Sequence, residues 1–194
     1  LQLTPSLMRE LVDILAAQTD DWQPRLIVVG GEKLHGADLL ALRDMLGWTC
    51  PVIHRLASSE AGVVAEWEVD LNGLTAQSAV PVGYAVKNRE LSIVDEQDQP
   101  VGSGEIGEIV ITGDYLANGY WQRPDLNEGK FFPAPLTDAP DRQRLKTGDL
   151  GRLRDNGLLE FLDRMDSLVK IRGYRVELGA VEAALRQLAG VSDA

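Results

Sequence analysis

The apolar positions of the N-terminal part of the chain switch between helical spacing and short unbroken runs. Thr4 and the proline behind it are typical of a helix start, and apolar residues three and four apart predict a helix over 5–18. The run 26–29, followed by two glycines, predicts a buried parallel strand. Helical spacing returns over 37–46, and 51–53 has the composition of another strand. Helix, strand, helix, strand is the rhythm of a doubly wound α/β sheet.

Beyond about residue 80 the pattern changes to short strand-like runs separated by polar turns. The runs lie at 91–94, 106–112, 158–162 and 168–171. Helical spacing returns over 180–188. The expected fold is therefore α/β followed by a mostly antiparallel β subdomain.

A glycine-rich segment at 102–107, Gly-Ser-Gly-Glu-Ile-Gly, fits the GxGxxG pattern of dinucleotide-binding folds. That chemistry needs a strand before the glycines and a helix after them, so that pyrophosphate meets a helix N-terminus. Here a polar turn comes before the glycines and the strand-like run 108–112 comes after them. We interpret the segment as a hairpin turn.

Composition narrows the class of protein. Of 194 residues, 44% are apolar and 25% are charged, which is ordinary for a globular protein with a sizeable core. The net charge of −11 argues against a nucleic-acid partner, although a few local cations or N–H groups suffice to bind ATP. Cys50 is the single cysteine, and the sequence has neither a signal peptide nor an apolar run of membrane-spanning length. We expect a soluble cytoplasmic protein with no membrane partner.

Three polar segments could carry chemistry, and each also has an ordinary structural interpretation. Gly-Gly-Glu at 30–32 lets a flat ligand approach the backbone, or makes a tight turn into the next helix. Ser-Ser-Glu at 58–60 offers a phosphate and Mg²⁺ corner, or the N-cap of a helix. Lys-Thr-Gly-Asp at 146–149, expected after a loop, suits a ribose diol or a turn. The charged run 164–175 has the composition of a solvated strand.

The order and spacing of the later segments resemble the adenylate-forming superfamily. Gly-Glu-Ile-Val-Ile-Thr-Gly at 107–113 resembles its GE(I/L)xIxG stretch, and Asn-Gly-Tyr-Trp-Gln-Arg-Pro at 118–124 resembles GYWxRP. Lys-Thr-Gly-Asp-Leu-Gly-Arg at 146–152 resembles its TGDLxR element.

The run that begins at Lys146 continues the resemblance to Glu182. Residues 161–166 resemble FLGRxD, with Asp163 in place of the glycine. Residues 169–178 resemble VKIRGYRIEL nearly residue for residue. The sequences of these motifs are most similar to those of adenylation domains of nonribosomal peptide synthetases.

The upstream half resembles the same family less closely. Gly-Gly-Glu at 30–32 resembles the motif that lies against adenine, and Pro-Val-Gly at 81–83 corresponds to P-I-G. Leu-Ala-Ser-Ser-Glu at 56–60 takes the place of YGPTE, so that Leu56 stands where an aromatic ring normally stacks on adenine. The resemblance therefore covers nearly the whole chain.

The resemblance implies a role for each matching side chain. Glu60 would help to hold Mg²⁺ on the ATP phosphates, and Ser59 would bond the α-phosphate. Asp149 would accept the ribose hydroxyls, with Arg164 assisting. The residues implied at the nucleotide are together Gly30, Gly31, Glu32, Ser59, Asp149, Arg164 and Lys170.

The resemblance also implies a division of the chain. Residues 1–80 would be the α/β portion of the large adenylation subdomain, 81–165 its β-rich portion, and 166–194 the hinge and the start of the mobile C-terminal subdomain. Asp166 would be the hinge. Gly173 would lie on the strand that enters the site for thioester formation, where a side chain would block a pantetheine arm.

A set of mostly apolar positions matches the family's acid-binding pocket: Ile27, Val29, Arg55, Val63 and Val64. Arg55 could pair with a second carboxylate or a keto group on the substrate. Alternatively, it points to solvent or to Glu66.

Two parts of the family pattern are missing from the sequence: the Gly/Ser/Thr-rich phosphate loop and the catalytic lysine. Neither Lys33 nor Lys170 is in the right context to replace that lysine. The chain also starts without a methionine, close to a helical pattern, so we expect a piece of a longer protein that is inactive by itself.

The expected function is activation of a carboxylic acid, an amino acid or a related acid, with ATP and Mg²⁺ to an acyl-AMP. The acyl group would pass to the phosphopantetheine thiol of a carrier protein in secondary-metabolite biosynthesis. Two alternatives stay open: a piece of a stand-alone acyl-CoA synthetase, or a non-catalytic docking piece.

Overall fold

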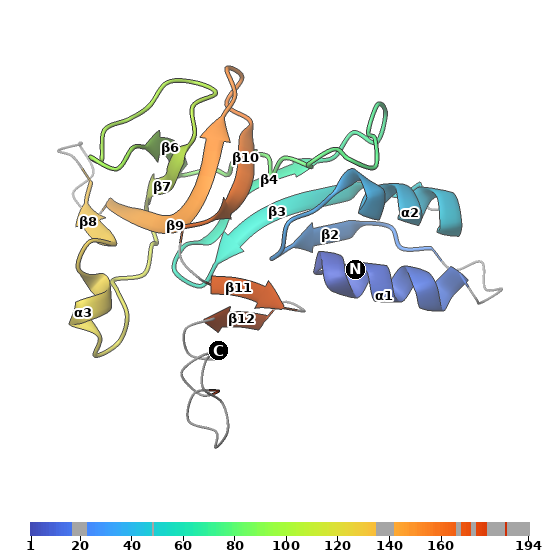
Figure 1. The fold of residues 1–194 in the computed structure, drawn as a ribbon, viewed down its shortest axis with the longest axis horizontal. Helices are drawn as coiled ribbons and strands as arrows, with labels where there is room; N and C mark the ends of the chain where they lie inside the picture. Colours follow the sequence, from blue (N-terminus) through green and yellow to red (C-terminus); the bar gives the residue numbers. More distant parts are fainter. Residues whose placement is uncertain are drawn as a thin grey trace.

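The computed structural model describes most of the chain. Described are residues 1–16, 23–47, 49–134 and 142–165, the strands 168–171 and 174–177, and Leu185. The described part forms two larger β-sheets, with helices α1 and α2 beside the first of them and a separate two-stranded sheet near the C-terminus (Figure 1).

The first sheet is five-stranded and mixed, in the order β1-β2-β3-β4-β5. Its strands are β1 (Gln2–Leu3), β2 (Ile27–Gly30), β3 (Val52–Ser58), β4 (Gly62–Glu68) and β5 (Tyr84–Ala85). The first three strands are parallel, and β4 and β5 continue the sheet antiparallel. The parallel strand predicted over 26–29 is thus present as β2.

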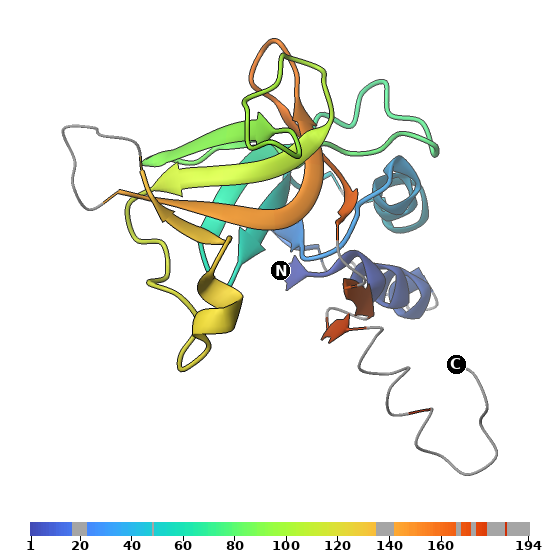
Figure 2. The same ribbon diagram turned by 60° about the vertical axis from the view of Figure 1, so that its left-hand side comes forward.

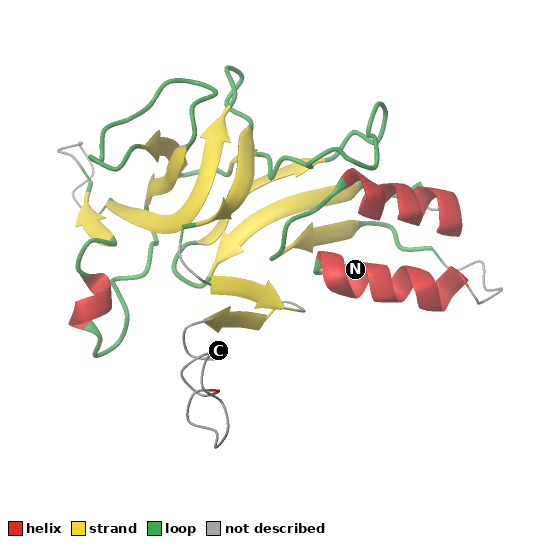
Figure 3. Ribbon diagram, in the orientation of Figure 1, coloured by secondary structure: helices red, strands yellow, loops and turns green. Residues whose placement is uncertain are grey.

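Helices α1 (Pro5–Ala16) and α2 (Gly36–Leu46) lie side by side and pack on the same strands (Figures 2 and 3). The hydroxyl oxygen of Thr4 accepts a hydrogen bond from the backbone N–H of Leu7 at 3.3 Å, which is the N-cap contact predicted for α1. Buried side chains from both helices meet those of β2 and β3 in one core: Met8, Val12, Leu39, Leu42, Ile27, Val29 and Val52. Continuous burial along this face explains why the apolar spacing predicted both helices.

The first sheet differs from the predicted doubly wound arrangement. Helices α1 and α2 both cover the same face of β2 and β3, and the β3–β4 hairpin packs against the second sheet instead. Strand β4 was not predicted, and the Ser-Ser-Glu segment at 58–60 forms the turn of this hairpin, so the helix N-cap interpretation is wrong. Gly62, with φ of 65°, supplies the left-handed backbone that closes the turn.

The second sheet is antiparallel throughout, in the order β10-β9-β7-β6 with β8 also on β9. Its strands are β6 (Arg89–Val94), β7 (Gly107–Gly113), β8 (Phe131–Pro133), β9 (Gln143–Leu153) and β10 (Leu159–Arg164). A short helix, α3 (Pro124–Asn127), precedes β8. The mostly antiparallel second region is therefore confirmed, and the GxGxxG segment is a turn before β7.

One long, curved strand departs from the sequence prediction. Lys-Thr-Gly-Asp at 146–149 was interpreted as a ribose site or a turn, and it lies inside β9 rather than at a turn (Figure 1). The register of β7 and β9 shifts beside it, and Gly148 has φ of 73°. A glycine bulge thus bends the strand next to Asp149.

Strands β11 (Leu168–Ile171) and β12 (Tyr174–Glu177) form a separate antiparallel sheet, in agreement with the strand predicted over 168–171. The helix predicted over 180–188 lies almost wholly outside the described residues.

Candidate functional site

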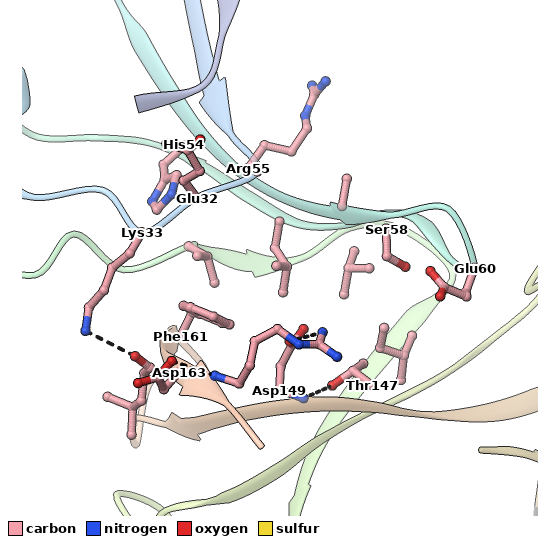
Figure 4. A pocket seen from close by; sticks show the side chains of 18 of the residues that line it. Glu32, Lys33, His54, Arg55, Ser58, Glu60, Thr147, Asp149, Phe161 and Asp163 are labelled. Carbon is pink, nitrogen blue, oxygen red and sulfur yellow. Dashed lines mark hydrogen bonds and ion pairs between the residues drawn. The ribbon is translucent and has the colours of Figure 1, made fainter. Parts of the chain in front are cut away.

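A pocket of about 690 Å³ lies between the β3–β4 hairpin and the second sheet (Figure 4). Its walls come from distant parts of the chain, from Gly31 to Arg164. Its lining includes these apolar residues: Leu56, Val64, Val80, Val82, Ile111 and Phe161. Polar groups gather at both ends, which is the usual construction of a small-molecule site.

One end of the pocket is the turn between β3 and β4. Ser58 and Glu60 lie at this end in Figure 4, and Ser59 also lines the pocket. The Ser58 hydroxyl accepts a hydrogen bond from the Ala61 N–H at 3.2 Å. The turn therefore places two hydroxyl groups and one carboxylate close together, and a hydrogen bond within the turn holds its backbone.

On the opposite wall, Asp149 of β9 pairs with Arg164 of β10. The Arg164 Nη1 to Asp149 Oδ1 distance is 2.6 Å, and the two side chains are 12% and 15% exposed. The Thr147 hydroxyl donates to the Ile109 carbonyl at 2.8 Å and accepts from the Asp149 N–H at 3.0 Å. A largely buried charge pair with good geometry is rigid, so the Asp149 carboxylate has a fixed direction.

The bulge that carries Asp149 is held by a buried carboxylate. The Glu108 carboxylate accepts a hydrogen bond from the Gly148 N–H at 2.9 Å and forms an ion pair with Lys146 at 3.1 Å. Lys146 also pairs with Asp98 at 2.5 Å, and these two carboxylates raise the lysine pKa, with the Asp98 hydrogen bond as the largest cause. The Glu of the GE(I/L)xIxG stretch therefore supports the TGDLxR element across two strands.

The other end of the pocket is bounded by the loop after β2. Glu32 accepts hydrogen bonds from the Ser6 N–H at 3.0 Å and the Ser6 hydroxyl at 2.6 Å, so its carboxylate lies at the N-terminus of α1. Lys33 donates to the Leu162 carbonyl at 3.1 Å and so bridges the two sheets. These contacts fix the Gly-Gly-Glu loop against the pocket.

His54 is a buried pocket residue that the sequence interpretation missed. It is 2% exposed, and its Nδ1 donates to the Pro81 carbonyl at 2.7 Å, a carbonyl that also accepts from Trp67 Nε1 at 3.0 Å. Burial lowers the pKa of His54 to about 4, although contacts with the backbone at 80 and 81 partly oppose this. The signal in the sequence was a histidine two positions after Val52, on the same side of β3.

Many of the residues singled out from the sequence line this one pocket: Gly31, Glu32, Arg55, Ser59, Glu60, Val64, Asp149 and Arg164. The pocket also contains Lys33, His54, Thr147, Phe161 and Asp163, which had been given no role in binding.

Four predicted residues are not among its lining. Ile27 and Val29 are fully buried in the core between β2 and the two helices, and their assignment to the acid-binding pocket stays a prediction. Val63 lies one position before the lining residue Val64 on β4, and successive side chains on a strand point to opposite faces. Gly30 packs against β3, where a Cβ would meet the Arg55 carbonyl at 2.4 Å, so it has a packing role.

The Arg55 side chain extends away from the cavity in Figure 4. Its Nη2 pairs with Glu66 across the β3–β4 hairpin at 2.7 Å, as the second interpretation of this arginine predicted. A partly exposed cross-strand pair of this kind contributes about 0.2–1 kcal/mol to stability.

Three further predicted residues cannot be placed at the pocket. Asp166 and Gly173 lie outside the described residues. Lys170 is described as a backbone position in β11, opposite Arg175 of β12.

Comparison with known proteins decides the family. The family model for AMP-binding enzymes matches residues 1–121 of this chain. The chain belongs to the AMP-binding enzyme family.

Relatives of this AMP-binding chain include large synthetases. It is 34% identical to tyrocidine synthase 3 of Brevibacillus parabrevis over 100% of its own length and 3% of that protein. It is 36% identical to enterobactin synthase component F of Shigella flexneri, covering 98% of this chain and 15% of the relative. The chain therefore spans a small part of the curated relatives that it matches.

The fold of this AMP-binding chain is that of adenylation domains. A solved NRPS protein containing adenylation and PCP domains, bound to a vinylsulfonamide inhibitor, superposes with a TM-score of 0.83 at 26% identity. That match covers 99% of this chain and 33% of the solved one. The resemblance to the adenylate-forming superfamily is thus confirmed. No described helix is long and apolar enough to cross a membrane.

Proposed function

We propose that this chain is part of an adenylation domain that activates a carboxylic acid with ATP to an acyl-AMP. The observation that supports this most is the convergence in one pocket of Gly31, Glu60, Asp149 and Arg164. These residues come from four separate segments of the sequence. Each is the residue to which the family resemblance gives a nucleotide role.

The polar ends of the pocket suit the parts of ATP. A carboxylate accepts several hydrogen bonds, so Asp149 can bind ribose hydroxyls while it holds Arg164. The loop at 30–32 would lie against the adenine, and Ser59 would bond the α-phosphate. Fixed groups of this kind lower the barrier by orienting the acid carboxylate for attack on the α-phosphate.

The residues near Glu60 also suit Mg²⁺. Among the described residues no group of three or more His, Cys, Asp or Glu side chains forms a metal site. A lone carboxylate beside hydroxyls is what Mg²⁺ accepts when substrate phosphates and water supply its other ligands. When bound, the ion would offset the charge of the phosphates. Glu60 would then orient it from the hairpin turn.

The acceptor and the domain division are parts of the same proposal. A carrier-protein phosphopantetheine is favoured because a solved relative contains both adenylation and PCP domains.

The proposed division of the chain has three parts. The large subdomain would consist of residues 1–80 and 81–165, and the small subdomain would begin with residues 166–194. Within the last part, Asp166 would be the hinge, Lys170 would lie near the nucleotide, and Gly173 would lie on the thiolation strand.

Acid-dependent exchange of pyrophosphate into ATP tests the proposed reaction. The complete adenylation domain that includes these residues is expected to exchange with one class from a panel of amino, hydroxy, keto and fatty acids. The isolated 194 residues are expected to show no exchange, because the phosphate loop and the catalytic lysine are missing from their sequence. Pyrophosphate exchange by the isolated chain would contradict the proposal. So would a complete domain that shows exchange with none of the acids in the panel. Loading of a carrier protein against loading of coenzyme A separates the two acceptors.

A further inference from the structure

The turn that carries Glu60 is hydrogen-bonded to β6 and to the segment that follows β7. The Ala117 N–H donates to the Glu60 carbonyl at 2.8 Å, and Arg89 Nη2 donates to the Ala61 carbonyl at 3.0 Å. Arg89 also donates to the carbonyl of Asp114. Contacts to two successive carbonyls fix the backbone of the turn. The orientation of the Glu60 carboxylate then depends on the side chains that contact it.

Tyr120 reaches that carboxylate. Its hydroxyl donates a hydrogen bond to Glu60 Oε1 at 2.6 Å, and the group is part-buried. An O–H to carboxylate bond of this length belongs to the strong, charge-assisted class. Since the two residues are 60 positions apart, the bond ties the loop before α3 to the polar end of the pocket.

Tyr120 is itself held on three sides. Its backbone N–H donates to Asn127 Oδ1 at 2.6 Å, and Asn127 Nδ2 donates back to its carbonyl at 3.3 Å. Its ring meets Phe131 edge to face with centroids 5.6 Å apart, and Lys130 Nζ lies 5.9 Å from its centroid. Phe131 packs on the core cluster that contains Ala61. The phenol is therefore a fixed donor.

From this geometry we propose that Tyr120 is a positioning residue: it orients the Glu60 carboxylate toward the metal-bound phosphates of the nucleotide. This inference rests on the proposed function. The phenol occupies one lone-pair direction of Oε1 and so restricts rotation of the carboxylate. A carboxylate already oriented loses less conformational freedom when it meets the ion.

The test measures binding of Mn²⁺ with the non-hydrolysable analogue α,β-methylene-ATP to the complete adenylation domain, by electron paramagnetic resonance. Tyr120→Phe keeps the ring packing and removes the donor. It is expected to weaken Mn²⁺ binding about tenfold, the equivalent of one hydrogen bond to a charged group. In a Glu60→Gln background the same change is expected to have no further effect, because its action passes through the carboxylate.

Trp121→Phe is the matched control, since Trp121 is the neighbouring aromatic residue and is 87% exposed. It is expected to leave Mn²⁺ binding unchanged. The inference is overturned if Glu60→Gln weakens binding and Tyr120→Phe does not, or if the two changes are additive. If Glu60→Gln itself leaves Mn²⁺ binding unchanged, the metal role in the proposed function fails, and the positioning role fails with it.

Discussion

Replacing Asp149 with alanine is expected to raise the KM for ATP roughly 100-fold or more in acid-dependent exchange. The reason is the loss of a charged acceptor for two ribose hydroxyls, each bond contributing about 1.5–3 kcal/mol. The same change removes the Asp149 carboxylate that pairs with Arg164, a side chain that is only 12% exposed. Removing one partner of a buried pair costs roughly 3–5 kcal/mol of folding stability. Exchange kinetics and denaturant unfolding of the complete domain measure the two effects separately.

Two variants sharpen this prediction. The double variant Asp149→Asn/Arg164→Gln, in which both members of the pair are neutral, is expected to unfold at higher denaturant than Asp149→Ala and still to bind ATP weakly. Asp155→Asn, in an exposed turn of the same hairpin, is expected to change neither quantity. An unchanged KM for ATP in Asp149→Ala would remove this carboxylate from the nucleotide site.

The stability of the domain is expected to fall below pH 6.5 in a way that depends on His54. Its pKa in the folded state is lowered to about 4 from 6.5. The unfolded chain therefore takes up a proton at a higher pH than the folded chain, and stability is lost as the pH falls from 6.5 toward 4. The shift corresponds to about 3 kcal/mol. Denaturant unfolding at several pH values, compared with His54→Gln, isolates this contribution.

Trp67→Phe provides the matched control for His54. It removes the other donor to the Pro81 carbonyl but no titrating group. Its cost in stability is expected to be the same at each pH, whereas the difference between His54→Gln and the unaltered domain is expected to shrink toward pH 4. A pH-independent difference for His54→Gln would contradict the assignment of a buried neutral imidazole.

Local pattern predicted many of the described helices and strands. The helices α1 and α2 and the strands β2, β6, β7, β10 and β11 lie close to their expected ranges. Strand β4 was missed because its apolar run is short and its turn resembles a helix cap. In β9 the segment 146–149 was also compatible with a turn, whereas a bulge keeps the strand paired on both sides of Gly148.

The motifs singled out Asp149 and Glu60 from the sequence, and both residues line the one described pocket. The site could not be predicted where it depends on which face of a strand a side chain occupies. The family resemblance placed Ile27 and Val29 at the acid-binding pocket, whereas both side chains pack in the core beside the helices. An unbroken apolar run such as β2 does not reveal which face of the strand each side chain occupies. Contacts between distant segments, such as Tyr120 with Glu60, leave no periodic signal in a single sequence.

The most direct test of the account is the position of the nucleotide itself. A crystal structure of the complete adenylation domain with AMP is expected to show the ribose hydroxyls within hydrogen-bond distance of Asp149. The phosphate is expected beside the 58–60 turn, and the base beside the 30–32 loop. AMP bound elsewhere, with the pocket between the β3–β4 hairpin and the second sheet occupied only by water, would contradict it.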